Sequence, residues 1–259
     1  MNLTLISVLL VAAFLLCLLA VAEIGRRLGI AKIARDPEGL PKGIGATEGA
    51  VFALLGLLLA FSFSGAASRF EDRRHLITAE TNAIGTAYLR VDLLPAAARP
   101  GMRDLFRRYV DSRLETYRNP QDRDATRVSL AEDIAIQNEI WARAVKESFS
   151  PEAPTQAAML LLPALNEMID ITTTRLMATR NHPPPVIFVL LAGISLVSAL
   201  LVGYGASVNK QHTWLHMLVF AAVLSLTTYV IIDLEFPRLG LIRVDGADIA
   251  LVELRETMK

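Results

Sequence analysis

The sequence predicts an all-α membrane protein with four transmembrane helices, the second of which extends into a helical bundle inserted between spans two and three. Hydrophobic residues make up 53% of the 259 residues, which is high for a soluble protein. Charged residues make up 20%, which is too many for a chain that lies wholly in lipid. The apolar residues are gathered into four long segments, and most of the charged residues lie between the second and the third.

These patterns divide the chain into five regions. The charges balance at 26 of each sign, so nothing indicates a nucleic-acid partner, and the lone Cys17 excludes a disulfide within the chain. We expect a first transmembrane helix and basic cytoplasmic loop at 1–45, a long second transmembrane helix at 46–94, the rest of the bundle at 95–183, transmembrane helices three and four at 184–233, and a polar C-terminal tail at 234–259.

The first apolar segment, Leu3 to Ala22, is long enough to cross a bilayer. Its end, Ala20-Val21-Ala22, resembles a signal-peptide cleavage site. However, no basic residue precedes the segment, and its apolar stretch exceeds the usual length of a signal peptide. We therefore expect a retained transmembrane helix.

A basic loop is expected from Glu23 to Gly43. By the positive-inside rule it is cytoplasmic, so four spans place the bundle and both termini outside the cytoplasm. The arginines at 69, 73 and 74, close to the end of the second span, favour the opposite orientation. The basic residues of the loop, for which we expect no function beyond anchoring lipid headgroups, are Arg26, Arg27, Lys32, Arg35 and Lys42.

No proline interrupts the chain between Thr47 and Leu94, so we expect one helix of about fifty residues, roughly 70 Å long. Its apolar part, Ala46 to Ala67, spans the membrane, and the remainder continues beyond it. One face of this helix carries small residues that allow another helix to approach closely, either in the same subunit or in a symmetry copy around a pore. That helix-packing face contains Gly49, Gly56, Ala60 and Ala67.

The remaining helices follow from amphipathic periodicity and from turn residues. Gly101 to Arg118 is an amphipathic helix, the capping box Ser129–Glu132 is expected to open the next, and Pro154 to Arg180 forms a further helix with Pro163 inside it. The other expected elements are the spans Val186–Ala206 and Leu215–Ile232, a tight turn at Asn209–His212, an interfacial anchor at Trp214 and a brief strand at Gly240–Asp245.

Motifs for catalysis are absent from the sequence: it has no Walker loop, HExxH, nucleophile elbow or CxxC, so neither an enzyme nor a cofactor is predicted. His212 and His216 are four residues apart, but no third ligand is close in sequence, so an interfacial pair is favoured over a zinc site. A polar cluster is predicted in the bundle, either as a satisfied interhelical network or as a cation or ligand site, from Glu80, Asn82, Asn166 and Asp170.

Four strings resemble those of the bacterial bestrophin-like membrane proteins: GAVFALLGLLLAFSFSGAASRFEDRR, ETNAIGTAYLRVDLLP, LLPALNEMIDITTTR and DLEFPRLGLIRV. The resemblance covers nearly the whole chain. It implies a four-span protein of the bacterial inner membrane with a large domain between spans two and three. It also implies a more distant relation to bestrophins, which are pentameric anion channels with a pore lined by the second span. The chain departs from bestrophins in two respects: it has no acidic run like their calcium clasp, and its basic first loop favours the opposite orientation.

We therefore expect a homo-oligomer in the lipid bilayer, a pentamer if it follows the bestrophins, that passes small ions and favours anions. Leu59 and Phe63 are the candidates for an apolar gate, and Arg69, Arg73 and Arg74 for a basic ring at the mouth. The alternative is a non-conducting sensor or scaffold whose bundle binds a ligand or partner.

Overall fold

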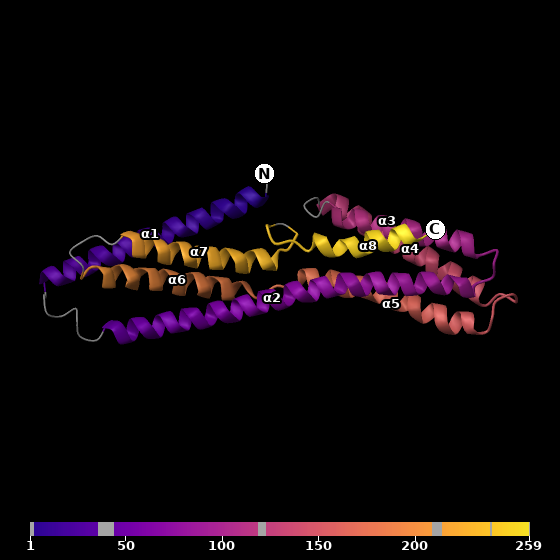
Figure 1. Ribbon diagram of the computed structural model, residues 1–259, viewed down its shortest axis with the longest axis horizontal. Coiled ribbons are helices and arrows are strands. Elements are labelled where there is room, and N and C mark those ends of the chain that lie inside the picture. The colour runs from indigo at the N-terminus through magenta and orange to yellow at the C-terminus, as the bar shows by residue number, and fades with distance from the viewer. Residues whose placement is uncertain (1–2, 36–43, 119–122, 209–213, 239, 259) are drawn as a thin grey trace. The chain divides into compact units, whose positions relative to one another are not determined.

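The computed structural model describes residues 3–35, 44–118, 123–208, 214–238 and 240–258, and within them every regular element is a helix (Figure 1). Four segments are long and apolar enough to cross a membrane: Val8–Arg35, Gly45–Leu93, Gln156–Ala206 and Trp214–Glu235. The predicted fold class is thereby confirmed. The elements are α1 (Leu3–Arg35), α2 (Ile44–Arg90), η1 (Val91–Leu93), α3 (Arg99–Arg118), α4 (Arg123–Ser148), α5 (Gln156–Arg180), α6 (Pro185–Ala206), α7 (Trp214–Glu235), η2 (Asp245–Asp248) and α8 (Ile249–Thr257).

Two predicted helix boundaries are wrong. The first helix does not end at Ala22 but continues to Arg35, because charge alone does not stop a helix and Glu23 pairs with Arg26 and Arg27 along its surface. The capping box Ser129–Glu132 lies inside α4, which begins at Arg123, since no proline or glycine separates the two positions.

The expected strand at Gly240–Asp245 is also absent from the described residues, where the chain bends instead. The Asp233 carboxylate accepts the backbone N–H groups of Leu241 and Ile242, which are therefore not available to a sheet. The predicted turn at Asn209–His212 falls outside the described residues, and so does His212 of the predicted pair with His216, which itself lies in α7. The C-terminal part of the predicted basic loop, 36–43, is outside them as well.

The helices form two compact units, Met1–Arg69 with His182–Ile242, and Phe70–Asn181 with Arg243–Lys259. We call them the membrane unit and the bundle. Helix α2 contributes its apolar part to the first and its charged part to the second.

Within the membrane unit, α1 and α6 pack with their backbones in contact. A Cβ on Gly203 would lie 1.7 Å from the carbonyl oxygen of Ala22, and a Cβ on Gly25 would lie 2.0 Å from that of Leu200. Gly25 and Gly29 form a GxxxG pattern, which allows this close approach between helices in lipid.

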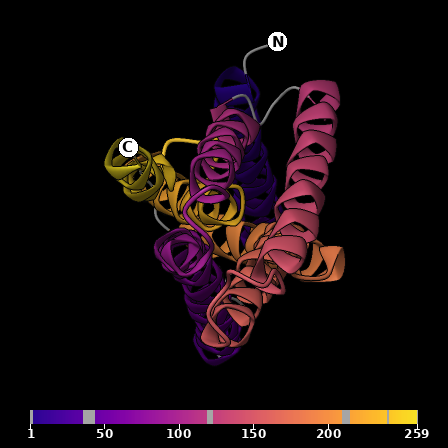
Figure 2. The same cartoon turned by 90° about the vertical axis from the view of Figure 1, so that its right-hand side faces the viewer.

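The bundle has a core of large apolar side chains from α2, α3, α4, α5 and α8, whose arrangement can be followed in Figures 1 and 2. Tyr109, Phe106 and Met168 are fully buried in it. The C-terminal helix α8 belongs to the same core through Leu251 and Met258. Burial of these side chains from water is the main force that holds this unit together.

Candidate functional site

The packing face predicted on α2 is open in the single chain. Cβ positions at Gly49 and Gly56 have no neighbouring atom within 4 Å among the described residues, and Ala60 is exposed. Ala67, at the end of the face, is half-buried. The predicted gate residue Phe63 is 46% exposed, and Leu59 is half-buried at the edge of the face.

A different stripe of α2 packs inside the membrane unit. Phe52 lies against Phe220 of α7 with ring centroids 6.3 Å apart, and Leu55 and Ala66 are buried. At the end of this stripe Arg69 reaches Glu235. Phe52 and Leu55 are three residues apart, as are Ala66 and Arg69, and the two pairs are separated by eleven residues, or about three helical turns. They therefore lie on one helical face, and the small residues occupy another.

The membrane unit carries an ionic cluster where its helices end. Arg69 donates from Nε and Nη2 to one carboxylate oxygen of Glu235, with Nε 2.8 Å away. The other carboxylate oxygen lies 3.4 Å from His182 Nδ1, whose ring packs against Phe236 at 4.7 Å. Glu235 is only 1% exposed, so the charge of Arg69 compensates a carboxylate that is shielded from water.

Asp233, two residues before Glu235, organises the chain that follows α7. Its Oδ2 accepts Ile242 N–H at 2.7 Å, and Leu241 N–H lies about 3 Å from both carboxylate oxygens. A Cβ on Gly240 would lie 1.4 Å from Asp233 Oδ1, so any larger residue here would displace the Asp233 carboxylate. The DLEFPRLGLI string thus contains two carboxylates with different partners: Asp233 accepts backbone N–H groups of the segment after α7, and Glu235 pairs with Arg69.

Arg73 and Arg74 belong to the bundle, and neither extends freely. Arg73 is 6% exposed and donates to the carbonyl oxygens of Ala178 and Asn181, at 3.1 and 3.0 Å. It therefore caps the end of α5, where helix carbonyls lack partners. Arg74 is exposed and pairs with Glu71 at 2.9 Å. Within the single chain, the three arginines predicted as a ring are thus each engaged with a different group.

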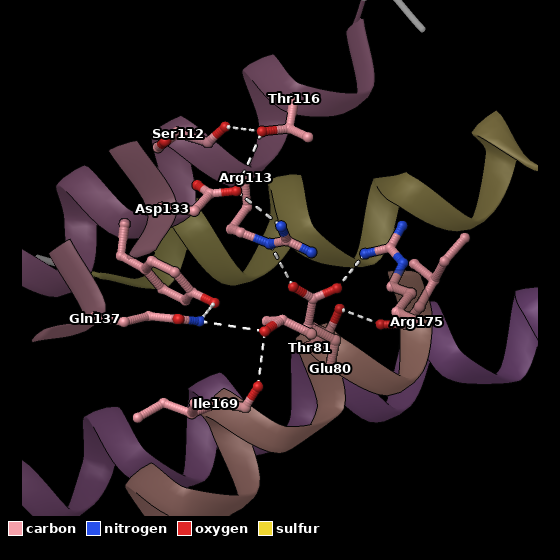
Figure 3. A network of polar contacts seen from close by, with 12 residues as sticks. Glu80, Thr81, Ser112, Arg113, Thr116, Asp133, Gln137, Ile169 and Arg175 are labelled. Carbon is pink, nitrogen blue, oxygen red and sulfur yellow. Dashed lines mark hydrogen bonds and ion pairs between the residues drawn. The ribbon is translucent and has the colours of Figure 1, made fainter. Parts of the chain in front are cut away.

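The centre of the bundle is a buried ionic network around Glu80 (Figure 3). Arg113 of α3 donates to Glu80 from Nε at 2.6 Å, and Arg175 of α5 donates to its second oxygen. Arg113 also reaches Asp133 of α4 at 2.8 Å, and Arg175 reaches Asp248 at 3.3 Å. The network therefore joins α2, α3, α4, α5 and η2.

Burial disfavours the ionised form of Glu80, but the guanidinium groups of Arg113 and Arg175 outweigh it and lower the pKa of this carboxyl below its ordinary value. Glu80 lies well beyond the apolar stretch of α2. Beside it, burial raises the pKa of the Tyr109 phenol, which accepts a hydrogen bond from Gln137 at 2.9 Å. Gln137 reaches Thr172 as well, so polar side chains continue the network toward α5.

The predicted partners of Glu80 are not at this site. Asn82, Asn166 and Asp170 are exposed in the single chain. Asn166 and Asp170 lie on the side of α5 turned away from Leu165 and Met168, which pack into the core, and Asn82 is likewise turned outward on α2.

Sequence reasoning missed Arg113, Asp133 and Arg175. Each continues an apolar stripe at helical spacing: Arg113 follows Phe106 by seven residues, and Arg175 follows Met168 by seven. A charged residue at a position where the periodicity requires an apolar one is the signal that could have found them. No group of three His, Cys, Asp or Glu side chains within the described residues is arranged to hold a metal ion.

The family model described as a Bestrophin-like domain matches residues 11–248, which includes the second, third and fourth candidate spans, the first except for its first three residues, and nearly all of the bundle. The chain belongs to the bestrophin-like family. No curated protein and no solved structure matches it. The bestrophin-like chain is therefore a multi-pass membrane protein. One ionic cluster, around Glu235, lies at the ends of the helices of the membrane unit, and a second, around Glu80, lies buried in the bundle.

Proposed function

We propose that the protein is a homo-oligomeric ion channel, with copies of α2 around the pore and small anions as the favoured ions. The observation that carries this proposal is the uncovered face of α2, where Cβ positions at Gly49 and Gly56 have no atom of a described residue within 4 Å. The helix is packed on its other side, so this face remains available to neighbouring copies. Membership of the bestrophin-like family supports the same assembly.

The gate in this proposal is apolar. Phe63 lies on the uncovered face and Leu59 at its edge, so copies around an axis would place apolar side chains at one level of the pore. Such a constriction conducts ions only when water fills it. Arg74 is the predicted mouth residue with the greatest exposure, because Arg69 and Arg73 are more deeply engaged with partners.

The test combines assembly and flux. We expect the purified protein in detergent to have the mass of a closed oligomer and Gly56→Leu to disrupt it, whereas Gly193→Leu, on an open position of α6, leaves the mass unchanged. We expect Phe63→Ala to raise chloride flux from liposomes. Phe61→Ala, which shortens a more exposed phenylalanine on another face of α2, is the control.

A second candidate function is a non-conducting sensor or scaffold. It is favoured by the engagement of Arg69 with Glu235 and of Arg73 with the end of α5, which leaves fewer cations for an anion pathway. Liposomes that are equally tight to chloride, potassium and protons with wild type and Phe63→Ala would exclude the channel and favour this alternative.

The proposed orientation places the bundle outside the cytoplasm of a bacterial inner membrane. It rests on the basic residues that follow the first apolar segment. In a Cys17→Ser background, a cysteine at Asp124 should react in intact cells with a membrane-impermeant thiol reagent, and one at Arg35 should not. The reverse pattern of labelling would overturn this orientation.

A further inference from the structure

A cavity of about 240 Å³ lies within the membrane unit, between α2, α6 and α7. Its walls are apolar side chains from all three helices, among them Leu58, Phe61, Ile187, Leu190 and Ile231. The volume is smaller than that of a typical site for a whole small-molecule ligand. It suits a single hydrocarbon chain.

One end of this cavity is polar, because Arg69 and Glu235 line it. Nε and Nη2 of Arg69 are used by the carboxylate, whereas Nη1 makes no hydrogen bond among the described residues. The Arg69 side chain is 25% exposed, and its buried partner Glu235 fixes its position. His182 lies on the other side of Glu235 and is 32% exposed.

The position of this polar end along the helices matches the level of lipid headgroups. Arg69 follows the apolar stretch of α2, Pro183 comes just before α6 begins, and Glu235 is the last residue of α7. The three apolar helices thus end together at the cluster, and the apolar walls of the cavity lie on the hydrocarbon side of it. Basic side chains at this level interact with anionic headgroups.

We propose that this cavity is a specific site for an anionic glycerophospholipid, with the phosphate on Arg69 and one acyl chain between α2, α6 and α7. The charges of Arg69 and Glu235 cancel, so the headgroup is selected by the remaining N–H groups of Arg69 and by His182. A lipid that carries a cationic choline is disfavoured, because that cation would approach the same groups. The apolar walls require a chain beneath the phosphate, so inorganic phosphate alone lacks most of the contacts.

The test uses fluorescence quenching in the full-length protein. Phe188 lines the cavity and is half-buried, so Phe188→Trp in a Trp141→Phe, Trp214→Phe background reports on its occupant. The protein is placed in nanodiscs that contain phosphatidylglycerol or phosphatidylcholine with identical brominated chains. We expect phosphatidylglycerol to quench at a lower mole fraction than phosphatidylcholine. Addition of inorganic phosphate should not relieve the quenching.

Two further variants separate the site from its surroundings. Arg69→Gln with Glu235→Gln removes both charges together, so that no carboxylate is left uncompensated, and should abolish the preference between the lipids. Arg74→Gln, which alters an exposed arginine outside the cavity, should preserve it. Ser62→Phe should fill the cavity and reduce quenching by both lipids. Equal quenching by the two lipids in the wild type would overturn the proposal, as would relief by phosphate or an unchanged preference in the double variant.

Discussion

The two units of this protein are held together by different kinds of contact. The bundle encloses Glu80 and Arg113, which are 0% and 3% exposed, together with large apolar side chains. The membrane unit brings backbones together at Gly25 and Gly203 and turns large apolar side chains outward, with Val223, for example, 60% exposed.

The difference follows from the solvent around each unit. Water drives large apolar side chains into a core, and ions can enter that core when they are paired. Lipid gives no comparable advantage to buried apolar area, so helices associate where small residues permit close contact.

The contrast can be measured because the chain has two tryptophans, Trp141 in the bundle and Trp214 in the membrane unit. Two single-tryptophan variants therefore report on the two units separately.

The largest effect is expected from Glu80→Ala. This change leaves Arg113 and Arg175 buried without the carboxylate that they share, at a cost of roughly 3–5 kcal/mol. We expect a markedly lower Tm by Trp141 fluorescence and little change by Trp214. Asp170→Ala is the control, since Asp170 is exposed and should cost little. A Tm that falls equally for both variants would contradict the assignment of Glu80 to a buried network.

Acid should produce a smaller version of the same effect. The pKa of Glu80 in the native protein lies below its ordinary value of 4.5, so this carboxylate adds stability above pH 4.5 and loses it as the pH falls through the lowered pKa. We expect the Trp141 transition to shift to lower temperature in that acid range. The part of the shift due to Glu80 should disappear in Glu80→Gln. An acid shift of the same size in both proteins would assign it to other carboxylates.

In the membrane unit the comparable change is an added methyl group. Gly203→Ala places a Cβ 1.7 Å from the Ala22 carbonyl oxygen, which forces α1 and α6 apart at a cost of about 1–3 kcal/mol. We expect the Tm followed by Trp214 fluorescence to fall and the Tm followed by Trp141 fluorescence to remain unchanged. Gly193→Ala, on the same helix, places a Cβ that has no atom of a described residue within 4 Å, and should be neutral or slightly stabilising. Equal effects of the two alanines would mean that the close helix contact is not required.

The sequence predicted the helices better than the contacts between them. The four apolar segments and the absence of a break in α2 were sufficient for the fold class, because hydrocarbon thickness and helix rise fix the length of a span. The partners of Glu80 could not be obtained from local pattern alone. Arg113 and Arg175 are far from it in sequence, and only the tertiary fold brings three charged positions on apolar stripes together. Similarly, nothing local indicated that Arg69 turns toward Glu235.

The smallest effect is expected at the surface of the bundle, where α8 is joined to α3 by Arg255 and Asp111. The two hydrogen bonds, at 2.8 and 3.0 Å, have better geometry than the 3.3 Å contact between Arg175 and Asp248. However, the Arg255 and Asp111 side chains are 32% and 53% exposed, against 5% and 17% for Arg175 and Asp248. Solvent screens the exposed pair, so we expect Arg255→Ala to cost less than about 1 kcal/mol and the cost to fall with added salt.

A double-mutant cycle for each pair, followed by Trp141 fluorescence, measures both coupling energies. The coupling between Arg175 and Asp248 should be the larger and the less sensitive to salt. If the exposed pair had the larger coupling, geometry rather than burial would set the strength of ion pairs in this bundle.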